Sequence, residues 1–172
     1  MKFIRFVLLM FVFIPSECYS QFRKDCNIHF DENKIHYNYN LDFFLNKLKT
    51  DSFTLSQDRK QIPSFIKGKL DCLLGDMANK GEDWQQTDVI FDETLPLHLL
   101  QFFLINKSND VFIIVYRNGG IGEYTVILMM HLTDKGVIID HQKNVDDAWY
   151  SDSFFTGTTI QELTEHLTRK ND

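Results

Sequence analysis

Two histidines in the second half of the chain have the residue type and spacing to do chemistry together. His131 and His141 flank Asp134-Lys135-Gly136, which suits a three-residue hairpin loop with Gly in the left-handed region. That loop would pair Met129 with His141, so that the two histidines become diagonal neighbours on one face, with alpha carbons about 7 Å apart. Two imidazoles at that spacing can share a metal ion or a bridging water.

A shorter loop would separate the two histidines. A two-residue turn at Asp134-Lys135 pairs Met129 with Asp140 and turns His141 to the opposite face. This turn requires positive φ at Asp and Lys, which is less favourable than placing Gly there.

A metal site also requires a third ligand, and the sequence singles out none. Asp146, Asp147 and Glu123 are carboxylates nearby in the sequence. Histidines in strands are more often structural residues than ligands. We therefore keep His131 and His141 as a metal-site hypothesis, which would make the protein a metal-assisted hydrolase.

The common catalytic signatures are missing from the sequence. It contains no GxSxG, HExxH, GxxxxGK[S/T], GxGxxG or EF-hand loop. This weakens an enzymatic interpretation without excluding it. We name no catalytic residue and expect no cofactor, and the sequence favours a binding protein.

A glycine-rich segment, Asn118-Gly119-Gly120-Ile121-Gly122, superficially matches a phosphate-binding loop. A strand follows it, whereas a phosphate loop is followed by a helix and a lysine. A hairpin that needs positive φ explains these glycines better. The alternative is that the loop backbone approaches a ligand, which makes Gly119 and Gly120 candidate contacts.

The segment 144–155 is rich in aromatic residues and carboxylates, and we predict it to be a loop between the last strand and the last helix. Such a loop suits protein or sugar recognition, with Trp149, Tyr150 and Phe154 as candidate contacts. The interpretation that we favour is that Trp149 and Phe155 pin the loop to the core.

Residues 1–20 have the pattern of a cleavable signal peptide, with two early positive charges and an apolar run from Phe6 to Ile14. The run is too short to be a stable membrane anchor. Cleavage after Ser20 would make Gln21 the first residue of a periplasmic or secreted protein. Lipidation of Cys18 is the alternative, although Glu17 is a poor residue to precede a lipidated cysteine.

Export leaves two cysteines, Cys26 and Cys72, and an oxidising compartment favours a disulfide between them. The 152 residues that remain are the usual size of one domain. The whole chain has a formal net charge of −6, which makes nucleic acid an unfavourable partner. The few local basic clusters are Arg59-Lys60, Lys67 and Lys69. We interpret them as solvated surface next to a helix.

Three amphipathic helices are predicted from the apolar spacing. The first carries Leu41, Phe44, Leu45 and Leu48 behind Asn40, a suitable N-cap. The second starts after Pro63 and stops before Gly81, with two glycines inside it. The third starts at the capping box Thr159-Ile160-Gln161-Glu162.

Between the second and third helices, short turn signals separate four apolar segments, as in an antiparallel meander. These are 97–105, 111–117, 124–132 and 137–142, with 87–91 as a possible fifth strand at the edge. Segments 111–116 and 126–130 are apolar on both faces, so both faces must be covered. If the helices cover only one face, the other is a partner interface or a ligand pocket.

The sequence therefore predicts an α+β fold, an antiparallel β-meander of four to five strands packed with two N-terminal helices and one C-terminal helix. Residues 21–172 form the single domain and residues 1–20 the signal peptide. We expect an exported, non-enzymatic binding or interaction domain for an unknown protein or small ligand. Its oligomeric state stays open.

Overall fold

The computed structural model describes residues 26, 28, 36–86, 94–120, 122–134 and 143–171, without the side chains of Asn144 and Asp152. Several predicted features lie outside the described residues: the signal peptide, Gln21, the possible strand 87–91, the strand 137–142 and His141 within it. No helix in the described part of the chain has the length and apolar character needed to cross a bilayer.

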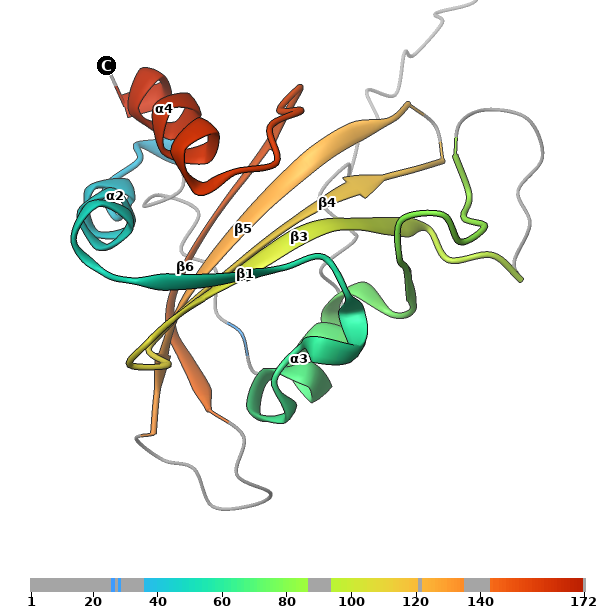
Figure 1. Ribbon diagram of the computed structural model, residues 1–172, viewed down its shortest axis with the longest axis horizontal. Helices are drawn as coiled ribbons and strands as arrows, with labels where there is room; N and C mark the ends of the chain where they lie inside the picture. The colour runs from blue at the N-terminus through green and yellow to red at the C-terminus, as the bar shows by residue number, and fades with distance from the viewer. Residues whose placement is uncertain are drawn as a thin grey trace, which may run out of the picture.

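One six-stranded sheet forms the centre of the fold (Figure 1). Its strands are β1 (Phe53–Ser56), β2 (Met77–Ala78), β3 (His98–Asn106), β4 (Val111–Asn118), β5 (Tyr124–Thr133) and β6 (Asn144–Ser153). The order is β1-β3-β4-β5-β6 with antiparallel neighbours, and β2 pairs with β3 in parallel. Strands β3, β4 and β5 confirm three of the predicted strands to within one residue at each end.

Helices cover both faces of this sheet. They are α2 (Leu41–Thr50), α3 (Ser64–Leu74) and α4 (Ile160–Asn171). Along β4, Val111, Ile113 and Val115 join the core with α2 and α4, whereas Phe112 and Ile114 join the core with α3. Figure 1 shows α2 and α4 together on one side of the sheet and α3 on the other. The doubly apolar strands thus reflect a sheet between two helical layers, which confirms the predicted α+β class.

The helix ends match the predictions in part. At α4, Thr159 Oγ1 accepts from the Glu162 backbone N–H at 3.2 Å while Glu162 Oε2 accepts from the Thr159 N–H at 3.0 Å, which confirms the capping box. Asn40 precedes α2 but makes no capping bond; its side-chain N–H instead donates to the Ala148 carbonyl at 2.8 Å. The second helix ends at Gly75, where φ is +69°, and not near Gly81 as predicted.

The prediction that residues 144–155 form a loop is wrong for most of that range, because residues 144–153 form the edge strand β6. Met129 pairs with Trp149, which replaces both predicted pairings of Met129, with His141 and with Asp140. The physical reason is side-chain alternation: Trp149 enters the core with α2 and α4, and Ala148 enters the core with α3. Carboxylates and serines between the apolar residues hide this period in the sequence.

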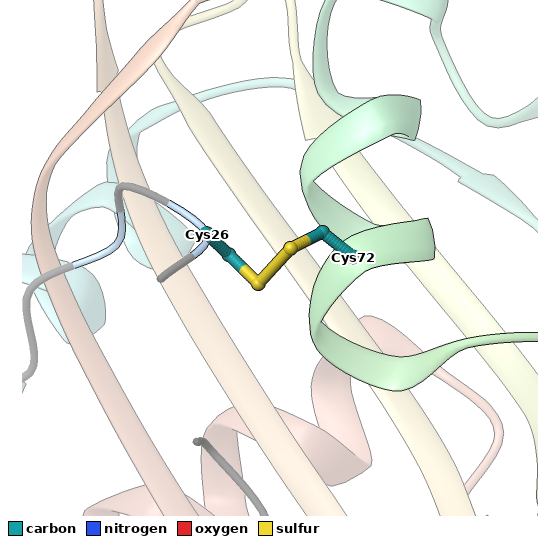
Figure 2. The surroundings of a disulfide bond; sticks show 2 residues. All are labelled: Cys26 and Cys72. Atoms are coloured by element: carbon teal, nitrogen blue, oxygen red, sulfur yellow. A yellow bond between two sulfur atoms is a disulfide. The ribbon is translucent and has the colours of Figure 1, made fainter. Parts of the chain in front are cut away.

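A disulfide joins Cys26 to Cys72 on α3, with the two alpha carbons 5.8 Å apart (Figure 2). This confirms the predicted bridge. The bond attaches the N-terminal segment to the helix that covers one face of the sheet, and Cys26 is buried there with 8% of its surface exposed.

Candidate functional site

His131, the first predicted metal ligand, lies on β5 with its side chain 30% exposed. Its Nδ1 atom is 3.6 Å from Asp146 Oδ2, and its ring packs edge-on against Phe43 of α2, 5.0 Å between centroids. A register shift next to His131 leaves Asp146 as an extra residue on β6, so the bulge directs this carboxylate toward the imidazole.

His131 and Asp146 could therefore supply two ligands to a metal ion. His141 lies outside the described residues, and the strand register that made it a neighbour of His131 is wrong. Within the described ranges, no three side chains of the His, Cys, Asp or Glu type are grouped so as to hold a metal ion. His131 and Asp146 form an imidazole–carboxylate pair at the surface.

The aromatic residues predicted to contact a ligand lie in three different environments. Trp149 is 1% exposed in the core, and its indole N–H donates to Asn38 Oδ1 at 3.2 Å. Phe155 is also buried, so the core role of Trp149 and Phe155 is confirmed. Tyr150 is half-buried against the core with α3, and Phe154 is 92% exposed. Of the three candidate contacts, Phe154 alone presents its whole ring to solvent.

The backbone of Gln85 and Gln86 packs against Gly119 and Gly120 of the glycine hairpin. A Cβ atom on Gly119 would lie 1.7 Å from the Gln85 carbonyl oxygen. The Gly119 N–H donates to the Leu97 carbonyl at 3.0 Å, and the Gly120 N–H donates to the Gln86 carbonyl at 2.7 Å. These contacts explain why glycine stands at 119, and they use the amides that a ligand would need.

A further histidine, His98, was not singled out from the sequence. It is 7% exposed on β3, and its ring contacts Tyr116 edge-on with centroids 5.1 Å apart. Burial lowers the pKa of His98 to about 4. The imidazole is therefore neutral at physiological pH, which suits a structural residue.

A hollow of about 280 Å³ opens between α3 and the short 3₁₀ helix η2 (Arg59–Gln61). We call it the η2–α3 hollow. Its lining is Arg59, Lys60, Ile62, Lys67, Leu70, Asp71, Gly75, Asp76 and Met77. Local sequence builds its walls: Asp58 caps η2 by accepting from the Lys60 backbone N–H at 2.9 Å, and Gly75 ends α3.

The hollow has an apolar floor. Leu70 and Met77 are 3% and 6% exposed, and both belong to the core with α3. Ile62 is half-buried and packs against the same core. These residues come from α3, from β2 and from the end of η2, so the pairing of β2 with β3 completes the floor.

Charged side chains surround the floor, and most of them are paired. Arg59 Nη1 lies 2.5 Å from Asp76 Oδ1 and also donates to the Met77 carbonyl. Lys67 Nζ lies 2.9 Å from Asp71 Oδ2, one helical turn away. Lys60 makes no ion pair within 4.0 Å in the described part of the chain. The lining thus holds three cationic side chains and two carboxylates.

A second and wider hollow lies on the other side of η2, with a volume of about 730 Å³. Its lining is largely polar: Leu55, Ser56, Gln57, Asp58, Lys60, Gln61, Asn79, Lys80 and Glu82. Of the described residues, Lys60 alone lines both hollows.

Sequence reasoning treated the basic residues of this region as solvated surface and missed the hollow. Lys60 and Lys67 are exposed, as that interpretation expects, and Lys67 also forms an ion pair with Asp71. Arg59 is partly exposed and pairs with Asp76, whereas Lys69 is 7% exposed with its pKa lowered by burial. The signal was the clustering of Arg59-Lys60 and Lys67 around Pro63. It could not reveal that Met77 returns beneath α3 to supply the apolar floor.

Comparison with known proteins gives no relative from which a role could be transferred. No protein-family model matches the chain, and neither a curated protein nor a solved structure matches it.

Proposed function

We propose that this protein is an exported binding domain and that the η2–α3 hollow is its ligand site. The observation that carries the proposal is the combination of an apolar floor with a charged rim in a concave region. Sites for small ligands are typically concave, mostly apolar and about 300–1,000 Å³ in volume, with a few polar groups that orient the ligand. The hollow, at about 280 Å³, lies just below that range.

The rest of the described structure supports this location. The core takes up Trp149, the Gln85–Gln86 backbone covers the glycine hairpin, and helices pack on both faces of the sheet. Trp149, the glycine hairpin and the two sheet faces are therefore used by the fold itself, while Phe154 stays exposed. The η2–α3 hollow is lined by residues of α3, of η2 and of β2.

Binding can be tested with 1-aminoanthracene, a neutral apolar fluorescent probe. We expect Ile62→Gln to weaken probe binding at least threefold, because it places an amide in the apolar floor. Leu55→Gln is the matched control, since Leu55 is 36% exposed and lines the other hollow. Urea unfolding of each variant checks the fold. Equal binding by wild type and Ile62→Gln would exclude the hollow as the site.

Export is the second part of the proposal. The charge and apolar pattern of residues 1–20 supports it, as does the Cys26–Cys72 disulfide, because such bonds persist in oxidising compartments. N-terminal sequencing and intact mass of protein from the native host provide the test. We expect a chain that begins at Gln21 without lipid. A diacylated Cys18 would instead show a lipid-anchored protein.

A further inference from the structure

We infer that the η2–α3 hollow selects anions, so that its ligand is a small amphipathic anion whose charged group is bound by Lys60. This inference rests on the proposed function of the hollow as a ligand site and adds the chemical class of the ligand. It follows from how the charges around the apolar floor are paired.

Each carboxylate that lines the hollow has a cation next to it. Asp76 is held by Arg59 and Asp71 by Lys67. A cationic ligand would have to compete with these two side chains for the same oxygens. Lys60 forms no ion pair within 4.0 Å with a described residue, so among the cations that line the hollow its ammonium is the one not held by a carboxylate at contact distance.

Glu82, in the wider hollow, is a competing carboxylate: hydrogen bonds from Asn79 lower its pKa, and the charges of Arg59 and Lys60 lower it further. Its Oε2 accepts from the Asn79 backbone N–H at 2.7 Å, and its Oε1 accepts from the Asn79 side-chain amide at 3.2 Å. These bonds hold Glu82 on Asn79, and Glu82 forms no ion pair with Lys60 within 4.0 Å. Among the described residues, Lys60 forms no ion pair with a carboxylate of either hollow.

The local charge also runs against the charge of the whole protein. The lining carries one more cation than carboxylates, whereas the chain has a formal net charge of −6. A basic hollow on an acidic protein attracts anions locally while the rest of the surface repels them. This charge distribution favours a small anion that contacts the hollow alone. It disfavours a polyanion, which would also contact the acidic surface around the hollow.

The volume limits the size of the apolar part. About 280 Å³ corresponds to roughly nine water molecules at about 30 Å³ each. A chain of about eight carbons with one carboxylate matches that space, so octanoate is a suitable probe. Octylammonium has the same tail with the opposite charge, and acetate has the charge without the tail.

The experiment is a titration of ¹⁵N-labelled protein with each of the three probes, followed by amide chemical shifts. We expect octanoate to shift amides of the residues that line the hollow and to bind at least fivefold more tightly than octylammonium, with no saturable shift from acetate. A fivefold difference in affinity corresponds to one contact between exposed charges. Lys60→Gln should weaken octanoate about fivefold and leave 1-aminoanthracene binding unchanged. Lys49→Gln, an exposed lysine on α2, is the control.

The outcomes separate this inference from the proposed function. Equal affinities for octanoate and octylammonium, with 1-aminoanthracene still bound, would overturn anion selectivity and leave the hollow as a binding site. An unchanged preference for octanoate in Lys60→Gln would overturn the role of Lys60. Failure of all probes to shift the lining residues would overturn the proposed function itself.

Discussion

The side-chain amide of Asn106 donates a hydrogen bond of 2.8 Å to Asp51, which ties the turn between β3 and β4 to the end of α2. The same nitrogen donates to Ser108 and Asp110, and Asn106 Oδ1 accepts from the backbone N–H groups of Asp110 and Val111. Asn106 is 1% exposed. Asn106-Lys107-Ser108 matches the N-glycosylation pattern Asn-X-Ser, yet the Asn106 amide is fully used inside the fold.

Replacing Asn106 with Ala should lower the free energy of unfolding by about 2–3 kcal/mol at pH 7, because buried donors and acceptors lose their partner. Urea unfolding measures the change. Asn46→Ala is a suitable control, since Asn46 is exposed on α2, and it should change stability by no more than about 0.5 kcal/mol. A loss at Asn106 no larger than this control would show that the network contributes little.

Asp110 should make the free energy of unfolding depend on pH in the acidic range. Burial alone would raise the pKa of Asp110, but hydrogen bonds from Asn106, Ser108 and Lys47 lower it to about 2. Because this pKa is below that of the unfolded chain, the contribution is complete above about pH 4 and is lost as the pH falls toward 2. The carboxylate is partly exposed, so we expect about 1 kcal/mol.

Urea unfolding at pH 7, 4 and 2.5 tests this dependence. Asp110→Asn should lose less stability than wild type between pH 4 and pH 2.5, whereas Asp83→Asn, at an exposed position, should follow the wild-type curve. Parallel curves for wild type and Asp110→Asn would rule out Asp110 as the titrating group.

The disulfide should contribute about 4 kcal/mol to the free energy of unfolding, since Cys26 and Cys72 are 46 residues apart in the sequence. Urea unfolding of wild type and of a Cys26→Ser, Cys72→Ser double variant measures this contribution. Peptide mapping without reductant should recover the two cysteines in one linked pair. Separate alkylated peptides from unreduced protein would show that the bond does not form.

Gly119 and Gly122 should respond differently to the same added methyl group. Gly119→Ala brings Cβ into the Gln85 backbone and should cost more than about 3 kcal/mol or prevent folding. Gly122 has a φ of +86° with open space around it, so Gly122→Ala should cost only about 1 kcal/mol. Thermal and urea unfolding compare the two. Equal costs would mean that the Gln85–Gln86 segment moves away from the hairpin easily.

Local patterns in the sequence predicted much of this fold. The helix at 41–50 follows from apolar spacing, α4 follows from its capping box, and β3, β4 and β5 follow from apolar runs bounded by turn residues. Export, together with two remaining cysteines, predicted the disulfide. Each of these signals is contained within a few neighbouring residues or in a count of one residue type.

The candidate site required contacts between distant parts of the chain. Strand β6 has carboxylates between its apolar residues, and it is recognisable only from its pairing with β5. The η2–α3 hollow exists because β2 pairs with β3 and brings Met77 beneath α3, 15 residues after Ile62. The amino-acid sequence by itself determined α2, α4, the strands β3, β4 and β5, and the cysteine pair. The tertiary structure alone decided which charges are paired, because an ion pair depends on the distance between side chains in space.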